Sequence, residues 1–266
     1  MTDIEVPRRT LKLTVAYDGS RYCGWQRQIN GPSIQAALEK ALAEITRESI
    51  LVTGSGRTDS GVHALGQVVS FDTRSALSAD VFRQALNATL PPDIVVREAI
   101  EAAAGFHAIN DSLTKRYRYI VQPGRINDPF SLQRAWFVKR ILDAEVMHLA
   151  ARELLGTHDF ASFQAVGSPR LSTIRTVTDA EVRFEPCDPW GKIYIEVEAT
   201  GFLYNMVRII AGTLVDIGQG RGALGTISTI IAGQERKLAG MTAPAHGLYL
   251  LHVNYDRPPL ESQGDS

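Results

Sequence analysis

A glycine-rich stretch, residues 54–66, holds the residues of this sequence whose types and spacing are best suited to chemistry. It reads Gly-Ser-Gly-Arg-Thr-Asp-Ser-Gly-Val-His-Ala-Leu-Gly, with four glycines in thirteen residues. That density of glycine indicates tight turns, or a ligand that approaches the backbone closely. Asp59 is the one carboxylate of the stretch. Any acid-base or nucleophilic chemistry of a carboxylate in this loop must therefore use Asp59.

Three known loop chemistries can be compared with this stretch. The dinucleotide fingerprint G-x-G-x-x-G fails because Asp59 stands where the third glycine is needed, and no Gly-Lys-Ser/Thr follows to make a phosphate-binding Walker loop. Residues 59–61, Asp-Ser-Gly, match the aspartic-protease triplet, but that chemistry needs two aspartates that share a proton. One copy suffices only in a dimer that shares its site. A structural loop with Asp59 as a turn former is the remaining alternative.

The overall charge excludes a protein that binds nucleic acid as a bulk polycation. The chain of 266 residues has 28 Lys+Arg against 29 Asp+Glu, a net charge of -1. The charge is unevenly placed, with +4 over residues 8–28, +5 over residues 110–140 and -4 over residues 176–200. Aromatic residues are interleaved with the basic stretches: Tyr22, Trp25, Tyr117, Tyr119 and Trp136. Cations with rings predict a surface that contacts RNA. Ordinary solvated faces are the alternative.

The cysteines and the hydropathy indicate a reduced, cytoplasmic compartment. Cys23 and Cys187 are far apart and have no metal-ligand spacing around them, which argues against a disulfide framework and a zinc site. The first nine residues lack the apolar region of a secretory signal. The charge-free run at residues 238–255 is interrupted by glycines, a proline and histidines, so it does not predict a membrane span.

Apolar periodicity and capping residues predict an alternation of strands and helices. Ser33, Ser78 and Asp143 are the expected N-caps of helices at 34–46, 79–90 and 144–155. Two further helices are expected at 202–217 and 223–232. Strands are expected at 11–17, 50–53, 67–71, 94–97, 114–121, 135–138, 173–184, 192–199 and 248–253.

The first part reads β-α-β-β-α-β, and the second reads β-α-β-β-α-(α)-β with one additional helix. This order predicts an α/β (α+β) protein of two ferredoxin-like units with mostly antiparallel sheets. The first unit is expected at residues 1–110 and contains the loop 54–66. The second is expected at residues 111–266, with residues 111–134 as a linking strand and loop.

Residues 56–68, Gly-Arg-Thr-Asp-Ser-Gly-Val-His-Ala-Leu-Gly-Gln-Val, closely resemble the signature of the tRNA pseudouridine synthase A family. Further stretches are similar to other motifs of that family: Ala16-Tyr-Asp-Gly-Ser20 with Gly24-Trp-Gln26, Phe106-His-Ala108, Lys115-Arg-Tyr-Arg-Tyr119, His158-Asp-Phe-Ala-Ser-Phe163, Gly201-Phe-Leu-Tyr-Asn-Met-Val-Arg208, and the segment Pro244 to Leu250 with its final Gly-Leu-Tyr-Leu. The matches run in order along nearly the whole chain.

The resemblance implies the pseudouridine synthase fold, with an active-site cleft between the two units. It implies isomerisation of uridine to pseudouridine at positions 38, 39 and 40 of the anticodon arm of tRNA. The glycosidic C–N bond breaks, the uracil turns and is rejoined through carbon. No redox step or second substrate is involved, so neither a cofactor nor a metal is expected. The base must be flipped out of its stack to be reached. A homodimer that binds one tRNA across both subunits is also implied.

The resemblance assigns roles to individual residues. Asp59 is the catalytic carboxylate, acting either as nucleophile or as base and stabiliser of the ribosyl centre. Arg57 holds the backbone of the flipped nucleotide, Tyr117 stacks on the uracil, and Leu248 forms an apolar wall of the pocket. The structural alternatives are a surface arginine for Arg57 and core positions for Tyr117 and Leu248.

One departure from the family pattern affects the substrate-binding residues. The family commonly continues Phe-His-Ala with Arg-Phe, whereas Ile109 and Asn110 follow here. If that arginine contacts a phosphate, Lys115 or Arg116 would have to supply the charge, and His107 stays a candidate for substrate binding. None of the histidines is assigned to catalysis, because hydrogen-bonded structural histidines are the more common outcome in such motifs.

Arg208 is the sole charged residue between Glu198 and Asp216. It stands in the apolar helix expected at 202–217, and a helix that is apolar on nearly every side is usually buried. A buried guanidinium needs a partner. The resemblance points to an ion pair with Asp59; extension of Arg208 to solvent is the alternative.

These observations favour a tRNA-modifying enzyme. A non-catalytic RNA-binding module on the same fold and a dimeric aspartic protease are the competing hypotheses.

Overall fold

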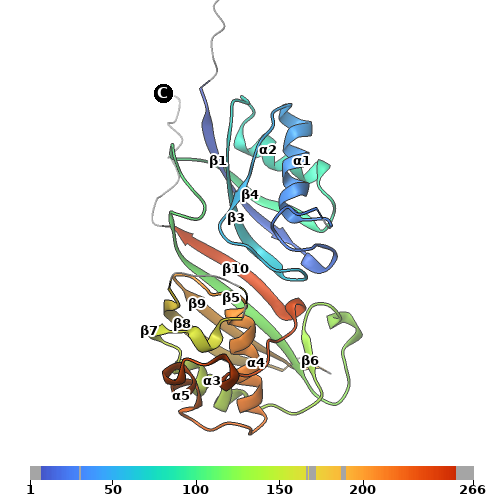
Figure 1. Cartoon of the computed structure of the whole chain (residues 1–266). Coiled ribbons are helices and arrows are strands. Elements are labelled where there is room, and N and C mark those ends of the chain that lie inside the picture. The colour runs from blue at the N-terminus through green and yellow to red at the C-terminus, as the bar shows by residue number, and fades with distance from the viewer. Residues whose placement is uncertain (1–6, 30, 166, 168–171, 187–189, 256–266) are drawn as a thin grey trace, which may run out of the picture. The chain divides into compact units, whose positions relative to one another are not determined.

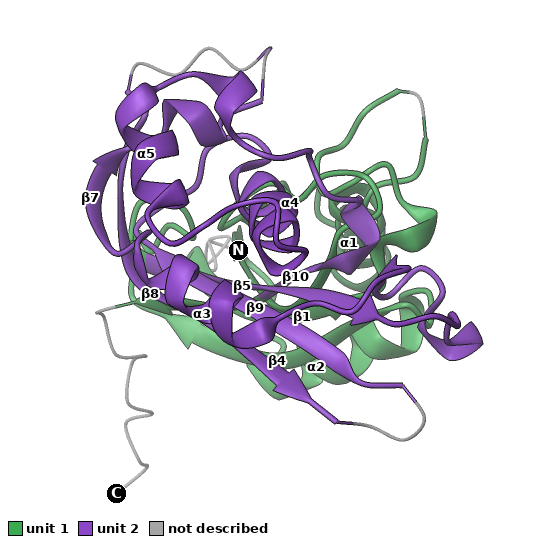
Figure 2. Ribbon diagram, turned by 90° about the horizontal axis from the view of Figure 1, so that it is seen from below, with its two compact units in different colours: residues 1–113, 251–266 green, residues 114–250 purple. Residues whose placement is uncertain are grey.

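The computed structural model describes residues 7–29, 31–165, 167, 172–186 and 190–255 (Figure 1). Cys187 lies outside the described residues. The chain divides into two units, one from residues 1–113 and 251–266 and one from residues 114–250 (Figure 2). Strand β10 (Leu248–Tyr255) contributes its first residues to unit 2 and residues 251–255 to unit 1. The sequence assigned all of β10 to the second unit, because an apolar pattern locates a strand along the chain but does not identify the residues that pack around it.

Unit 1 follows the ferredoxin-like order. Its elements are β1 (Arg9–Tyr17), α1 (Ile34–Thr46), β2 (Thr53–Gly54), β3 (His63–Thr73), α2 (Ala79–Thr89) and β4 (Ile94–Ala102). The strands lie in the order β4-β1-β3-β2, and each neighbouring pair is antiparallel. Helices α1 and α2 contact each other beside these strands (Figure 1). The expected ferredoxin-like architecture of this unit is confirmed.

Local sequence determines where the helices of unit 1 begin. The Oγ atoms of Ser33 and Ser78 accept hydrogen bonds from the third residue beyond each, so both predicted N-caps are confirmed. Alternating residues of β1, among them Leu11 and Leu13, are fully buried. On the helices, Leu38 and Phe82 are likewise fully buried, so strand and helices enclose one apolar core.

The strand expected at 50–53 is mostly absent, although Ile50 and Val52 are buried; Leu51 is exposed. Val52 hydrogen-bonds to side chains of α1 rather than to a strand, because its N–H donates to Glu39 and its carbonyl accepts from Gln35. The apolar pattern there therefore indicated burial and not sheet pairing. Conversely, β3 begins earlier than expected and β4 ends later.

Unit 2 also alternates strands and helices. Its elements are β5 (Ser112–Pro123), β6 (Trp136–Val138), α3 (Ala144–Arg152), β7 (Gly156–Asp159), β8 (Ile174–Glu185), β9 (Lys192–Ala199), α4 (Met206–Gly218) and α5 (Thr226–Gly233). The order β5-β9-β8-β7 is antiparallel throughout, and β6 pairs in parallel with the end of β5. The expectation of a linking strand at 114–121 is corrected, because β5 pairs with β9 along Lys115–Val121 and is part of the sheet.

The helix boundaries in unit 2 differ from the predicted ones for identifiable reasons. Asp143 caps α3 as expected, but the chain then forms the unpredicted strand β7. Helix α4 begins at Met206 rather than at residue 202 because Asn205 has a left-handed backbone with φ 59°. Among the described residues, no helix is both long enough and apolar enough to cross a bilayer.

Candidate active site

Asp59 lies in the loop between β2 and β3 of unit 1, and its side chain is half-buried. The Asp59 carbonyl accepts a hydrogen bond from Val62 N at 3.1 Å, which closes a tight turn. Gly61 stands in that turn with φ 79°, a backbone conformation that favours glycine. Arg57 is exposed two residues before Asp59. The loop thus presents a carboxylate and an exposed cation from one short segment.

The residues on either side of Asp59 are bonded to the segment that precedes α1. The Thr58 carbonyl accepts from Trp25 N at 3.0 Å, and the Thr58 hydroxyl shares a 2.8 Å hydrogen bond with the Tyr17 hydroxyl. On the other side, Ser60 Oγ donates to the Tyr22 carbonyl at 3.1 Å. The position of the Asp59 backbone is therefore determined by contacts outside its own loop.

The histidines of the motifs are engaged in local structure. His63 is buried, and its Nδ1 lies 3.1 Å from Gly19 N and 3.2 Å from Asp18 Oδ1. His107 Nδ1 accepts from the backbone N–H groups of Ile109 and Asn110 at 3.2 and 3.3 Å. His158 Nε2 is 2.7 Å from the Leu155 carbonyl. Substrate binding by His107 stays a prediction. Its Nδ1 is already used to hold the turn at Ile109 and Asn110.

Arg208 lies near the start of α4 in unit 2 and is half-buried. Its Nε donates to the Ala243 carbonyl at 2.7 Å, and its Nη1 donates to Asn205 Oδ1 at 2.8 Å. Asn205 is the residue with the left-handed backbone before α4, so the helix start and the guanidinium are fixed together. These bonds orient Arg208; its pairing with Asp59, a residue of unit 1, stays a prediction.

The segment that leads into β10 is bonded to β5. The Tyr119 hydroxyl donates to the Pro244 carbonyl at 2.7 Å. A Cβ at Gly247 would lie 2.6 Å from the Tyr119 ring, so the close packing there requires glycine. Burial raises the pKa of Tyr119, while the nearby Arg208 charge lowers it by a smaller amount. Tyr119, a residue expected at an RNA-contacting surface, is thus bonded to the same segment that Arg208 contacts through Ala243.

Tyr117 and Leu248 are both buried, as the core alternative for each would also require. The Tyr117 ring meets Phe202 edge to face, with ring centroids 5.1 Å apart. On β5, Lys115 and Tyr119 share the Tyr117 face, while Arg116 points to the opposite face. The strand therefore separates two residues, Tyr117 and Arg116, that the sequence assigned to one substrate site.

Arg116 is surrounded by carboxylates of β8 and β9. Its guanidinium nitrogens lie 2.7 to 3.3 Å from the carboxylate oxygens of four residues: Asp179, Glu181, Glu196 and Glu198. Arg118 donates to Glu196 at 2.7 Å on the same face. Because four of the five N–H groups of Arg116 are used in this way, we place it outside the candidate site.

This cluster predicts a stability effect that depends on pH. Burial raises the pKa of Glu196, but the ion pairs with Arg116 and Arg118 outweigh burial, and the pKa lies below its ordinary value. A lowered pKa adds stability above the unfolded-state value of about 4.3, and this stability is lost as pH falls through the folded value. Arg116→Ala is therefore expected to cost about 3 kcal/mol of unfolding free energy at pH 7. Urea unfolding should show a smaller difference from wild type below about pH 4.

The control for this prediction is Arg83→Ala, which removes an exposed ion pair with Asp80 and should cost about 0.5 kcal/mol or less. If Arg116→Ala instead keeps its stability and loses affinity for tRNA, Arg116 is a substrate-binding residue after all.

The aromatic residues of the basic stretches are mostly core. Tyr22, Trp25 and Tyr119 are buried, and Trp136 packs edge to face on Tyr119. Three cations of the first stretch are ion-paired: Arg9 with Glu101, Arg21 with Asp93, and Arg27 with Glu39. The expectation that these rings contact RNA is corrected, because they lie in the core; contact of the exposed Arg21 and Arg27 with RNA stays a prediction. Sequence could not show it, because their carboxylate partners and covering side chains come from distant segments.

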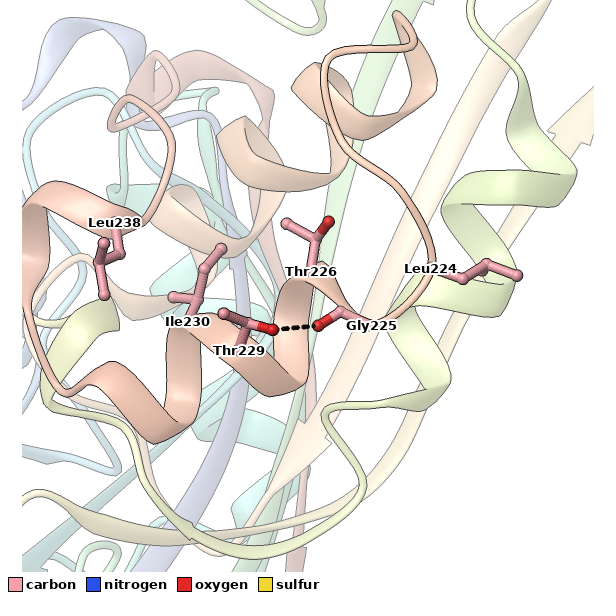
Figure 3. Close-up of a pocket in the computed structure, with 6 residues that line it drawn as sticks. All are labelled: Leu224, Gly225, Thr226, Thr229, Ile230 and Leu238. Carbon is pink, nitrogen blue, oxygen red and sulfur yellow. Dashed lines mark hydrogen bonds between the residues drawn. The ribbon is translucent and has the colours of Figure 1, made fainter.

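A surface pocket in unit 2 has none of the predicted site residues in its lining. It is lined by residues of α5 and its flanks, namely Leu224, Gly225, Thr226, Thr229, Ile230 and Leu238 (Figure 3). Thr229 Oγ1 donates to the Gly225 carbonyl at 2.8 Å within it. No group of three or more His, Cys, Asp or Glu residues that could hold a metal ion occurs in the part of the chain that the structure describes.

Comparison with known proteins identifies the family. A sequence model of tRNA pseudouridine synthases matches residues 13–109 and 150–256. A tRNA pseudouridine synthase A of Acetivibrio thermocellus is 43% identical over 247 residues, which cover 93% of this chain and 100% of the relative. A protein of the same name from Myxococcus xanthus is 43% identical over 255 residues, covering 96% and 95%. The chain therefore belongs to the tRNA pseudouridine synthases, a family of isomerases that act on tRNA.

Proposed function

We propose that this chain isomerises uridine to pseudouridine at positions 38, 39 and 40 of the tRNA anticodon arm, with Asp59 as the catalytic carboxylate. The observation that carries the proposal is the placement of Asp59 in a tight turn whose backbone is bonded on both sides, so the carboxylate is presented from a fixed position. A positioned carboxylate can attack carbon or accept a proton without a cofactor.

The uracil and its nucleotide need binding groups as well as the carboxylate. Arg57 is exposed beside Asp59 and is proposed to hold the backbone of the flipped nucleotide. Tyr117 and Leu248 are proposed to receive the uracil, and Arg208 to pair with Asp59. Lys115 shares a strand face with Tyr117 and is proposed to contact a phosphate. Flipping costs a few kcal/mol, which such contacts must offset.

The experiment that tests the proposal is tritium release from tRNA that carries 5-tritiated uridine. The new bond forms at C5 of the base, so each turnover must expel the tritium. Release of tritium from the anticodon arm, with modified positions mapped to 38, 39 and 40, supports the proposal. Tight tRNA binding without release would instead favour the non-catalytic RNA-binding module.

Binding of tRNA is expected to weaken as salt rises, because phosphate contacts release counterions. The two basic stretches hold twelve Lys and Arg residues. Several are paired with carboxylates in the folded chain. The slope of log affinity against log salt should therefore be negative but correspond to fewer than twelve phosphate contacts. Filter binding between about 50 and 200 mM salt measures it, and an affinity that does not change over this range would contradict the prediction.

The assembly is proposed to be a homodimer in the cytoplasm that binds one tRNA across both subunits. The proposal rests on family membership. Sedimentation velocity at micromolar concentration tests the dimer, and a monomer alone, with and without tRNA, would contradict it.

A further inference from the structure

Residues 16–26, here called the opening motif, have no assigned role in the proposed reaction. They are nevertheless hydrogen-bonded to the loop around Asp59. Trp25 N and Ser60 Oγ bond the two segments together on the two sides of Asp59. Two glycines permit the close approach. A Cβ at Gly19 would lie 2.0 Å from the Val62 carbonyl oxygen, and one at Gly24 would lie 2.6 Å from the Thr58 carbonyl oxygen. The motif therefore lies in direct backbone contact with the catalytic loop.

Tyr17 is a residue of this motif whose side chain is bonded to the residue before Asp59. Its hydroxyl is 2.8 Å from Thr58 Oγ1, and Thr58 is the residue before Asp59. Tyr17 and Thr58 are 5% and 6% exposed, so water does not replace this bond easily. Burial raises the pKa of Tyr17 to about 12, against a smaller lowering by its hydrogen bonds with Thr58 and Gln67. The hydroxyl thus keeps its proton near neutral pH.

Gln67 extends the same network beneath the loop. It is fully buried, its Nε2 donates to the Gly56 carbonyl at 2.8 Å, and its Oε1 accepts from Ser55 Oγ at 2.6 Å. The loop is thereby bonded on its inner side at residues 55, 56 and 58. Every polar group of this network is satisfied within unit 1, which favours one arrangement of the loop over others.

We propose that Tyr17 is a positioning residue for the isomerisation, acting through Thr58 to fix the carboxylate of Asp59. It touches neither substrate nor reacting atoms. The proposal rests on the proposed function of Asp59. A displaced carboxylate still leaves the tRNA-binding surface in place, so loss of the hydroxyl affects turnover and not binding. Misplacement of a reacting group by about 1 Å can cost on the order of 100-fold in rate.

The test compares Tyr17→Phe, Thr58→Val and the double variant by tritium release and filter binding. Each single change removes the Tyr17–Thr58 hydrogen bond from one side, and Tyr17→Phe also removes the bond to Gln67. We expect kcat to fall about tenfold in each single variant, with KM and tRNA affinity unchanged. The double variant should be no slower than the worse single one, because the two changes remove one shared interaction.

Tyr22→Phe is the matched control. It removes a tyrosine hydroxyl from the same motif, but that hydroxyl donates to Asp93 at 2.7 Å and not to the loop. It should lose a similar amount of stability and keep its kcat. A Tyr17→Phe enzyme with wild-type kcat, or one whose loss equals that of Tyr22→Phe, would overturn the proposal. Wild-type protein that releases no tritium would instead show that the proposed function itself is wrong.

Discussion

Asp59→Ala is expected to lower the rate of isomerisation by about 10³-fold or more, because the reaction then lacks its carboxylate. The variant should remain folded. Val62 N bonds to the Asp59 carbonyl, and the contacts of Thr58 and Ser60 with the opening motif do not involve the Asp59 side chain. The measurement is single-turnover tritium release at saturating enzyme, together with filter binding of tRNA.

Asp80→Ala is the control for this variant. Asp80 is an exposed carboxylate of unit 1 that bonds to Arg83 and Gln84 on the surface of α2. It should isomerise at the wild-type rate. An Asp59→Ala enzyme that also turns over at the wild-type rate would reject Asp59 as the catalytic carboxylate, and with it the role of the loop.

Arg208→Ala is expected to lower isomerisation by about 100-fold and to cost about 2 kcal/mol of unfolding free energy. Two bonds explain the loss of stability. The Ala243 carbonyl and Asn205 Oδ1 each lose a charged donor in a partly buried place. Arg208→Lys keeps the charge but carries all its donors on one terminal nitrogen and cannot reproduce the separate Nε and Nη1 positions, so we expect it to recover little of either loss. Tritium release and urea unfolding measure the two effects.

Pairing of Arg208 with Asp59 is tested by a double-mutant cycle in urea unfolding, which needs no activity. If the two side chains pair, Asp59→Ala should change stability less in the Arg208→Ala background than in wild type. Additive effects would contradict the pairing. Arg236→Ala is the control, because Arg236 also donates to backbone carbonyls of unit 2, those of Ala239 and Gly240. It should lose stability and keep the wild-type rate.

Sequence alone located the loop around Asp59 and gave most of the order of the elements, with β7 and the strand expected at 50–53 as the exceptions. Ser33, Ser78 and Asp143 cap the helices they were expected to cap, because an N-cap bonds to residues two or three positions away. The motif around Asp59 identified the family for a similar reason, since a tight turn and its carboxylate are contained in a few consecutive residues. Helix caps and tight turns depend on residues a few positions apart, so the sequence alone predicts them.

Tertiary structure alone decided which cations and rings remain for a substrate. Arg116 belongs to a basic stretch in sequence, yet it is bound by carboxylates more than sixty residues away. Trp25 and Tyr119 were expected at an RNA surface and lie in the core. Tyr17 gained a proposed role because its hydroxyl meets Thr58 across 41 positions of sequence. Whether a side chain is buried or ion-paired depends on residues that folding brings close to it. The pattern of charge and hydropathy along the chain does not show which distant residues these are.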